Sequence, residues 1–207
     1  LYFINWITLS PFISVSDMKI SETLLVTFDL VIVLKDHFSW EQRKLGDFLK
    51  DPKLERVLVT TEDELVTLGL NLAGLRLGGN KNALSFGSTI YYRRYAGQLI
   101  YGKQNFFHGS IALIPDEYNE KCTSGDVPSF NIEGINSEYL YYYIARPEYY
   151  EPKESESIGT GSKRIHQEVL KTFSIFSPKS GQEQKKIADL IKSVNTLITL
   201  HQRKGIP

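Results

Sequence analysis

The middle of the chain alternates short runs of β-branched and aromatic residues with turns that contain glycine or asparagine. The runs predict four strands, over residues 88–92, 98–101, 110–114 and 129–132. Helical segments precede and follow them. The pattern therefore predicts a compact α/β domain of the mixed α+β type, with a curved, mostly antiparallel sheet.

Two short segments of this body are predicted to be helical. Residues 40–46, Trp-Glu-Gln-Arg-Lys-Leu-Gly, follow Ser39, a residue type that caps helices well. Residues 138–146 follow a second such residue, Ser137, and precede Pro147, which favours a helix end. The second helix carries four tyrosines, which we assign to the core rather than to stacking on nucleic-acid bases.

A different pattern begins at Gln182. Apolar residues recur there at intervals of three and four, while charged residues occupy the other positions, which is typical of an amphipathic helix of the coiled-coil type. The apolar stripe comprises Ile187, Leu190, Ile191, Val194, Leu197 and Ile198. Its near-heptad spacing covers only about two repeats and fits two arrangements. The stripe either packs against the body or forms an interface with a partner helix.

Residues 1–38 are apolar but irregular, and we assign them no function. Charged residues interrupt them, so no apolar run approaches the ~20 residues of a membrane-spanning helix, and the start lacks the basic region of a signal peptide. We expect a cytoplasmic protein with no membrane contact. The chain then divides into an unassigned segment (1–38), a main domain (39–180) and a helix (181–207).

The distribution of charges along the chain is more informative than the net charge. The chain has 24 Lys and Arg against 24 Asp and Glu, and its one cysteine, Cys122, excludes a scaffold held by internal disulfides. Residues 65–115 contain five cations and no carboxylate, residues 116–156 contain ten carboxylates and three cations, and residues 163–204 contain nine cations and three carboxylates. If folding joins the two basic segments, they form a face for a polyanion. Otherwise they are ordinary solvated charges.

The sequence offers no catalytic group and no metal site. Cys122 has no second cysteine, and no pair of histidines has the spacing of metal ligands. The loop Gly159-Thr-Gly-Ser-Lys163 lacks the spacing of a nucleotide-binding phosphate loop. Its backbone N–H groups can still approach a phosphate closely, with Lys163 and Arg164 supplying charge. The alternative is a simple connector.

Four segments resemble the specificity (S) subunits of bacterial type I restriction-modification systems. Residues 40–47 are similar to the start of their target recognition domain, and residues 96–130 are similar to its core strands. Residues 158–164, Ile-Gly-Thr-Gly-Ser-Lys-Arg, resemble the loop before its last strand. Residues 176–204 carry the proline, Glu-Gln and Gln-Arg-Lys pattern with which the spacer helix opens. The order of the four segments makes the resemblance specific over residues 39–204.

The resemblance implies a non-catalytic subunit that binds double-stranded DNA. The recognition domain of this family reads one half of a bipartite target, and the spacer helix pairs with a counterpart as a ruler of fixed length. The implied partners are methyltransferase (M) subunits and a restriction (R) subunit. S-adenosylmethionine, ATP and Mg would belong to those partners, and no cofactor would be bound by this chain.

The chain departs from the family pattern in two ways. It holds one recognition domain where most members have two, and its helix stops soon after Lys204. Two interpretations follow: a half-subunit that forms a homodimer or joins a second specificity half, or a non-functional fragment of a disrupted specificity gene. A third, from another functional class, is an assembly module that binds proteins through its helix and no DNA.

The residues expected to contact DNA are basic or amide side chains, which neutralise phosphates or bond guanine and adenine. For phosphates we select Arg93, Arg94, Lys163 and Lys171. For base edges we select Lys103, Gln104, Asn105 and Arg164. Further candidates are Lys81, His108, Gly161 and Ser162. The whole set requires the two basic segments to be neighbours on one concave surface.

Overall fold

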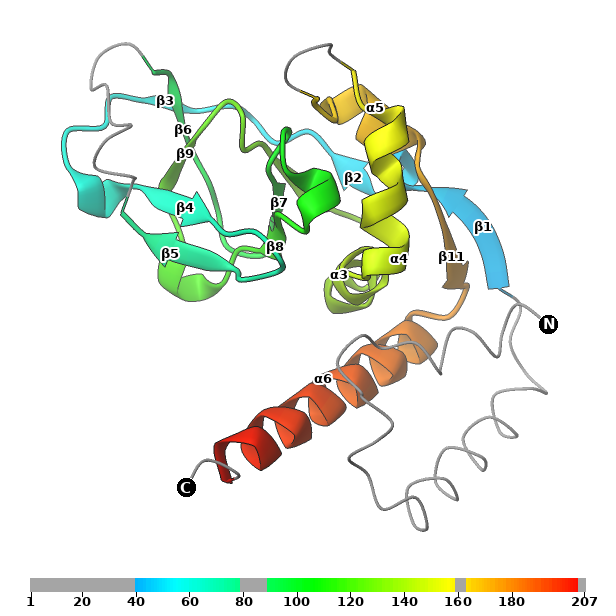
Figure 1. The fold of residues 1–207 in the computed structure, drawn as a ribbon. Coiled ribbons are helices and arrows are strands. Elements are labelled where there is room, and N and C mark those ends of the chain that lie inside the picture. The colour runs from blue at the N-terminus through cyan, green and yellow to red at the C-terminus, as the bar shows by residue number, and fades with distance from the viewer. Residues whose placement is uncertain (1–39, 79–88, 159–162, 205–207) are drawn as a thin grey trace.

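In the computed structural model, which describes residues 40–78, 89–158 and 163–204, small sheets and short helices pack above one long helix (Figure 1). The strands are β1 (Trp40–Lys44), β2 (Leu49–Lys50), β3 (Arg56–Val57), β4 (Val66–Leu68), β5 (Leu75–Leu77), β6 (Tyr91–Arg93), β7 (Leu99–Tyr101), β8 (Ile111–Leu113), β9 (Cys122–Ser124), β10 (Ser129–Ile132) and β11 (Ser174–Pro178). The α-helices are α3 (Ser137–Ile144), α4 (Pro147–Tyr150), α5 (Gln167–Thr172) and α6 (Gly181–Lys204). The 3-10 helices are η1 (Leu45–Asp47), η2 (Glu62–Glu64), η3 (Phe106–His108), η4 (Asp116–Tyr118) and η5 (Glu151–Glu156).

Every ladder between these strands is antiparallel. One sheet has the order β2-β10-β7-β8, a second has the order β3-β6-β9, and β4-β5 and β1-β11 form two-stranded sheets. The strands predicted over residues 98–101, 110–114 and 129–132 are confirmed as β7, β8 and β10. The mixed α/β class with mostly antiparallel pairing is therefore confirmed.

The helix predicted at residues 40–46 is wrong. β1 pairs with β11 there, in a register that runs from Trp40 opposite Pro178 to Lys44 opposite Ser174. Only the last residues of the segment are helical, in the 3-10 helix η1. Helix propensity is a weak preference, and a ladder with a distant strand outweighs it. The pairing places the start of the body beside the strand that leads into α6.

Figure 1 shows the body as two lobes, with β7 and β8 between them. One lobe contains β3 to β6 and β9, and the other contains α3, α4, α5, β1, β2 and β11. The first lobe has a small apolar cluster of its own, made by Val59, Leu65, Tyr91 and Cys122. The larger cluster fills the second lobe and reaches α6 through Ile187 and Ala188.

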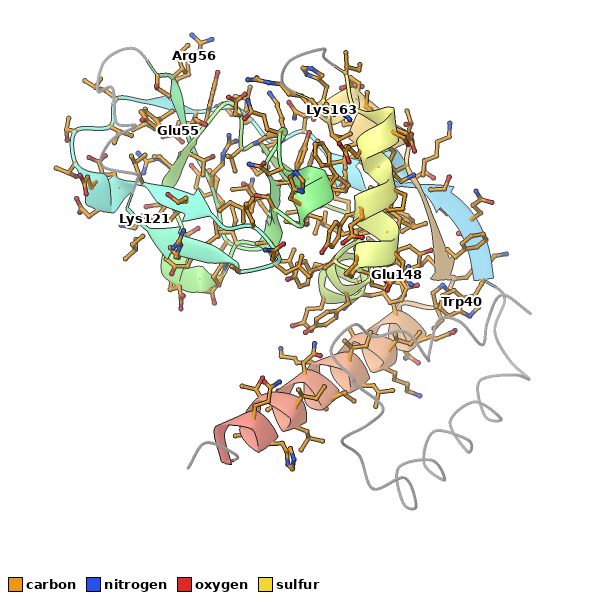
Figure 2. All side chains as sticks on the ribbon, viewed as in Figure 1. Trp40, Glu55, Arg56, Lys121, Glu148 and Lys163 are labelled. Atoms are coloured by element: carbon orange, nitrogen blue, oxygen red, sulfur yellow. The ribbon has the colours of Figure 1, made fainter. Side chains whose placement is uncertain are left out.

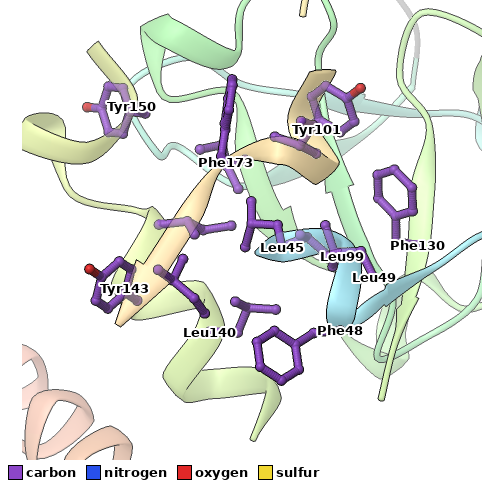
Figure 3. Close-up of a cluster of buried hydrophobic side chains, with 14 of the residues drawn as sticks. Leu45, Phe48, Leu49, Leu99, Tyr101, Phe130, Leu140, Tyr143, Tyr150 and Phe173 are labelled. Atoms are coloured by element: carbon purple, nitrogen blue, oxygen red, sulfur yellow. The ribbon is translucent and has the colours of Figure 1, made fainter. Parts of the chain in front are cut away.

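Nine of the twenty buried residues of the larger cluster are aromatic, and their rings pack against one another (Figure 3). Tyr101 stacks on Phe130 with ring centroids 6.1 Å apart, and Phe106 packs between Tyr101 and Phe173, at 5.9 Å from each. Burial raises the pKa of the Tyr101 phenol, whose hydroxyl donates to the carbonyl of Ile165 at 3.0 Å. The core therefore fixes the chain just before α5 against the end of β7.

The tyrosine-rich helix packs against the core, but only two of its four tyrosines are buried in it, while Tyr141 and Tyr142 are half-buried. Tyr139 and Tyr143 are buried, and the Tyr139 hydroxyl donates to the carbonyl of Phe176 in β11 at 2.8 Å. The cap differs from the expected Ser137, because the side chain of Asn136 accepts from the Tyr139 N–H at 2.8 Å. α3 therefore starts one residue earlier than predicted, and it ends at Ile144, before Pro147 opens α4.

α6 confirms the helix predicted from Gln182, and a buried glutamine joins it to the body. Gln184 is 4% exposed; its Oε1 accepts from the Asn136 N–H at 2.8 Å, and its Nε2 donates to Ser177 Oγ at 3.1 Å and to the Pro178 carbonyl at 2.8 Å. These bonds give the glutamine of the Glu-Gln pattern a structural role, since they fix the direction in which α6 leaves β11. Among the described residues, no helix is long and apolar enough to span a membrane.

Candidate nucleic-acid interface

The loop before α5 is closed at its base by an antiparallel bridge. The N–H groups of Ile158 and Arg164 donate to each other's carbonyls, both at 3.0 Å. The next residue, Ile165, donates its N–H to the carbonyl of Lys103 at 2.8 Å. The base of the loop is thereby fixed to the segment that follows β7.

That segment, between β7 and β8, is a compact turn that contains η3 and is held by its own backbone. The carbonyl of Asn105 accepts from the N–H groups of His108 and Ser110, both at 3.0 Å. Gly109 has φ 68°, in the left-handed region that glycine adopts at least cost. The turn leaves residues 103–105 half-buried and His108 exposed, so their side chains lie at the surface.

The turn between β9 and β10 meets the same segment. The carbonyl of Asp126 accepts from the Lys103 N–H at 2.9 Å, and its Oδ1 accepts from Arg164 Nη1 at 2.8 Å. The side chains of the Arg164–Asp126 pair are 34% and 51% exposed, so the pair lies in contact with water. Three segments far apart in the sequence therefore meet around Lys103.

Lys163 lies beside Arg164 and forms an ion pair with Glu154 of η5, with Nζ 2.8 Å from Oε1. This bond lowers the pKa of the Glu154 carboxyl, and the nearby His108 acts in the same direction. η5, which carries Glu154, packs against η3. We call the resulting patch the recognition surface; it comprises Lys103, Gln104, Asn105, His108, Lys163 and Arg164, with the carboxylates of Asp126 and Glu154 among them.

Arg94 does not belong to this surface, and its selection as a phosphate ligand is wrong. Its residue is 2% exposed, and its guanidinium donates to Thr123 Oγ1 at 2.8 Å and to the Val127 carbonyl at 3.1 Å. These acceptors are neutral, and burial lowers the pKa of Arg94 to about 10. Side chains alternate in direction along an extended chain, so Arg94 points inward while Arg93 points outward. Two adjacent arginines in a sequence do not show which of them faces the core.

Arg93 lies at the surface, in a separate cluster. Its Nε donates to Glu55 Oε1 at 2.9 Å, and the hydroxyl of Tyr95 donates to Glu55 Oε2 at 2.7 Å. In Figure 2, Glu55 and Lys163 both lie on the side of the body away from α6, but on different lobes. The basic segments do meet, but through residues 103–108 and 163–164, and not through the arginine pair.

Lys171 is a structural cation rather than an open phosphate ligand. Its side chain is 19% exposed, and its Nζ lies 2.7 Å from Asp51 Oδ2 and 3.3 Å from Glu168 Oε1. The ammonium also lies over the ring of Phe130, 5.5 Å from its centroid. The bond to Asp51 raises the pKa of Lys171. The residue therefore fastens α5 to the chain that follows β2.

Three selected residues lie outside the described ranges, namely Lys81, Gly161 and Ser162. Within those ranges, no three His, Cys, Asp or Glu side chains gather as a group that could hold a metal ion.

The apolar stripe of α6 is divided between two faces. Ile187 is buried, and Ile191 packs against the larger cluster. Val194 is half-buried, and Ile198 lines a groove of about 310 Å³ between α6 and α3. Leu190 and Leu197, seven residues apart, are 43% and 66% exposed. Packing against the body therefore uses one part of the stripe and leaves a seam of leucines in contact with water.

Sequence reasoning missed Asp126 and Glu154, the two carboxylates within the recognition surface. Both fall in the acidic stretch 116–156, which by its sum of charges looks unsuited to a polyanion. The pair Arg164–Asp126 joins residues 38 apart in the sequence, and charge counting along the chain carries no signal of such a contact.

A family model and two solved structures are similar to this chain. The family model of the type I restriction modification DNA specificity domain matches residues 39–206. An S subunit of a type I restriction-modification system from M. genitalium has a TM-score of 0.50 and 17% identity, over 79% of this chain and 41% of that chain. The HsdS subunit from Thermoanaerobacter tengcongensis has a TM-score of 0.56 and 16% identity, over 79% of this chain and 44% of that chain.

The structural matches show the fold of the chain, whereas the family model shows its family. The chain spans less than half the length of either solved subunit, and at these identities the structural likeness shows the fold. A comparison with curated proteins finds no match. The family match, in contrast, covers most of the chain, and a role in DNA specificity comes with it. The chain therefore belongs to the family of type I restriction-modification DNA specificity domains.

Proposed function

We propose that this chain is a sequence-specific DNA-binding specificity subunit that reads one half of a bipartite target in a type I restriction-modification system. The observation that carries the proposal is the convergence of residues 103–108, Asp126 and residues 163–164 on one surface. Cations suited to phosphates and amides suited to base edges lie there together. The family match and the fold support the assignment to duplex DNA.

The side chains of the recognition surface differ in the DNA groups that they can bind. Lys163 has a flexible ammonium at the loop base and binds backbone phosphate as a point charge. Arg164 presents a planar fork that fits the O6 and N7 acceptors of guanine, while Gln104 and Asn105 carry amides that fit adenine. Their backbones are fixed by the bridge and the turn described above, and this preorganisation favours a defined register on the duplex.

The seam of exposed leucines gives α6 its proposed role. Leu190 and Leu197 are seven residues apart, which is the spacing of a coiled-coil seam. In this proposal they pack against a helix of a second copy or of another specificity half. Methyltransferase subunits with S-adenosylmethionine, and a restriction subunit with ATP and Mg, assemble on this unit and perform the chemistry. The chain itself contributes recognition and no catalytic group.

Sequencing of methylated sites in a host that carries this chain with its partner subunits tests the function. We expect adenine methylation at one recurring bipartite sequence.

The double variant Leu190→Glu, Leu197→Glu is expected to abolish methylation without lowering the melting temperature, because both leucines are exposed. The matched control is Thr196→Glu, an exposed position on another side of α6, which should leave methylation unchanged. Methylation that survives in the leucine variant would contradict the proposed helix pairing, and scattered methylation would contradict the recognition role.

A further inference from the structure

Two cations of the recognition surface are paired with carboxylates from other parts of the chain. Arg164 Nη1 lies 2.8 Å from Asp126 Oδ1, and Lys163 Nζ lies 2.8 Å from Glu154 Oε1. With Lys103, the surface holds three cationic side chains and these two carboxylates. A surface that binds polyanions through charge alone has no use for carboxylates at that position, since they cancel the attraction on which it depends.

The backbone holds both carboxylates close to the surface. Asp126 lies in a turn closed by a bond from the Val127 N–H to the Ser124 carbonyl at 3.1 Å, and its own carbonyl accepts from Lys103. The carbonyl of Glu154 accepts from the N–H of Ser157 at 3.2 Å and from its hydroxyl at 2.6 Å. Each carboxylate therefore stays near the surface when its cation turns toward a ligand.

The two carboxylates affect the binding of phosphates and the binding of base edges differently. Ion pairs that are half exposed are weak, so the arginine and the lysine can exchange their carboxylates for a ligand. A phosphate bound to Arg164 would bring a second negative charge beside Asp126, and like charges at such distances repel. The O6 and N7 atoms of guanine are neutral acceptors and add no such charge. The carboxylates therefore weaken contacts with phosphates more than contacts with bases.

We propose that Asp126 and Glu154 are specificity-determining residues that suppress the binding of duplex DNA irrespective of its sequence. They neutralise Arg164 and Lys163 in the free protein and repel the backbone phosphates that any duplex presents. This inference rests on the proposed function, because it assigns the two carboxylates a part in DNA reading by the same surface.

The test is the affinity of the full chain for a random-sequence duplex, measured by fluorescence anisotropy over a range of salt concentrations. We expect Asp126→Asn and Glu154→Gln each to raise this affinity about fivefold at low salt. We also expect each to steepen the slope of log K against log salt by up to about 1, because each variant removes a carboxylate that competes with phosphate for a cation. The matched control is Glu156→Gln, which removes a neighbouring carboxylate of η5 that is paired with Lys153 at 2.8 Å, and it should change neither quantity.

A second variant shows whether the gain comes from the released cation. In Glu154→Gln combined with Lys163→Ala, the gain in affinity should disappear, because no ammonium is left to bind the phosphate. Wild-type binding with no gain in Asp126→Asn or Glu154→Gln overturns the inference and leaves the DNA-binding function standing. Failure of the wild type and of every variant to bind duplex overturns both. A melting temperature for each variant identifies any loss of folding; if Asp126→Asn unfolds, the exposed Glu154 decides the outcome alone.

Discussion

Replacement of both Lys163 and Arg164 by alanine is expected to lower the affinity for duplex DNA about thirtyfold at low salt. Arg164 belongs to the bridge at the base of the loop, Lys163 precedes it, and both lie next to residues 103–105, where basic and amide side chains occur together. The loss should also flatten the slope of log K against log salt, by less than 2 because Asp126 and Glu154 already neutralise part of the two charges. Both quantities come from one anisotropy titration series.

The matched control is the loss of two cations at a distance from the recognition surface. Lys185→Ala with Lys186→Ala removes the same formal charge from exposed positions near the start of α6. We expect a weak effect that disappears at moderate salt, because only the long-range field changes. Equal losses in the two double variants would mean that DNA senses net charge alone, and the recognition surface would lose its assignment.

The second large effect is on stability. Arg94→Ala is expected to lower the free energy of unfolding by about 3 kcal/mol and the melting temperature by about 10 °C. The substitution empties the volume of a buried side chain and removes the donor to Thr123 Oγ1 and the Val127 carbonyl. Chemical denaturation and a thermal melt, monitored by circular dichroism, measure both values.

The neighbouring arginine is the natural control for this variant. Arg93→Ala breaks an ion pair whose side chains are 30% and 48% exposed, and such pairs contribute about 1 kcal/mol or less. Equal destabilisation by the two variants would contradict the assignment of Arg94 to the core. A folded Arg94→Ala protein with reduced DNA affinity would return this residue to the list of phosphate ligands.

Local patterns predicted much of the fold. β7, β8, β10 and α6 lie where the short apolar runs and the helical periodicity place them, because the residues of each element carry the pattern themselves. β1 did not follow its local propensity. Its conformation depends on β11, more than a hundred residues later, and no local pattern indicates such a partner.

Like the fold, the candidate site contains residues that local patterns predict and residues that depend on distant contacts. Lys163 and Arg164 follow a glycine-rich loop, and residues 103–105 form a compact polar cluster, so a reading of the sequence finds them. The burial of Arg94 depends on which side of an extended segment faces the core, and the carboxylates depend on contacts between distant turns. The separation of Leu190 and Leu197 from the packed part of their stripe depends on the angle at which α6 meets the body.

Chemical acetylation of lysines with and without duplex DNA, read by mass spectrometry, tests the location of the interface most directly. We expect DNA to protect Lys103 and Lys163 from acetylation, while Lys185, whose side chain is 64% exposed on α6, reacts equally in both samples. Protection of lysines on α6, with Lys103 and Lys163 as reactive as in the free protein, would contradict this location.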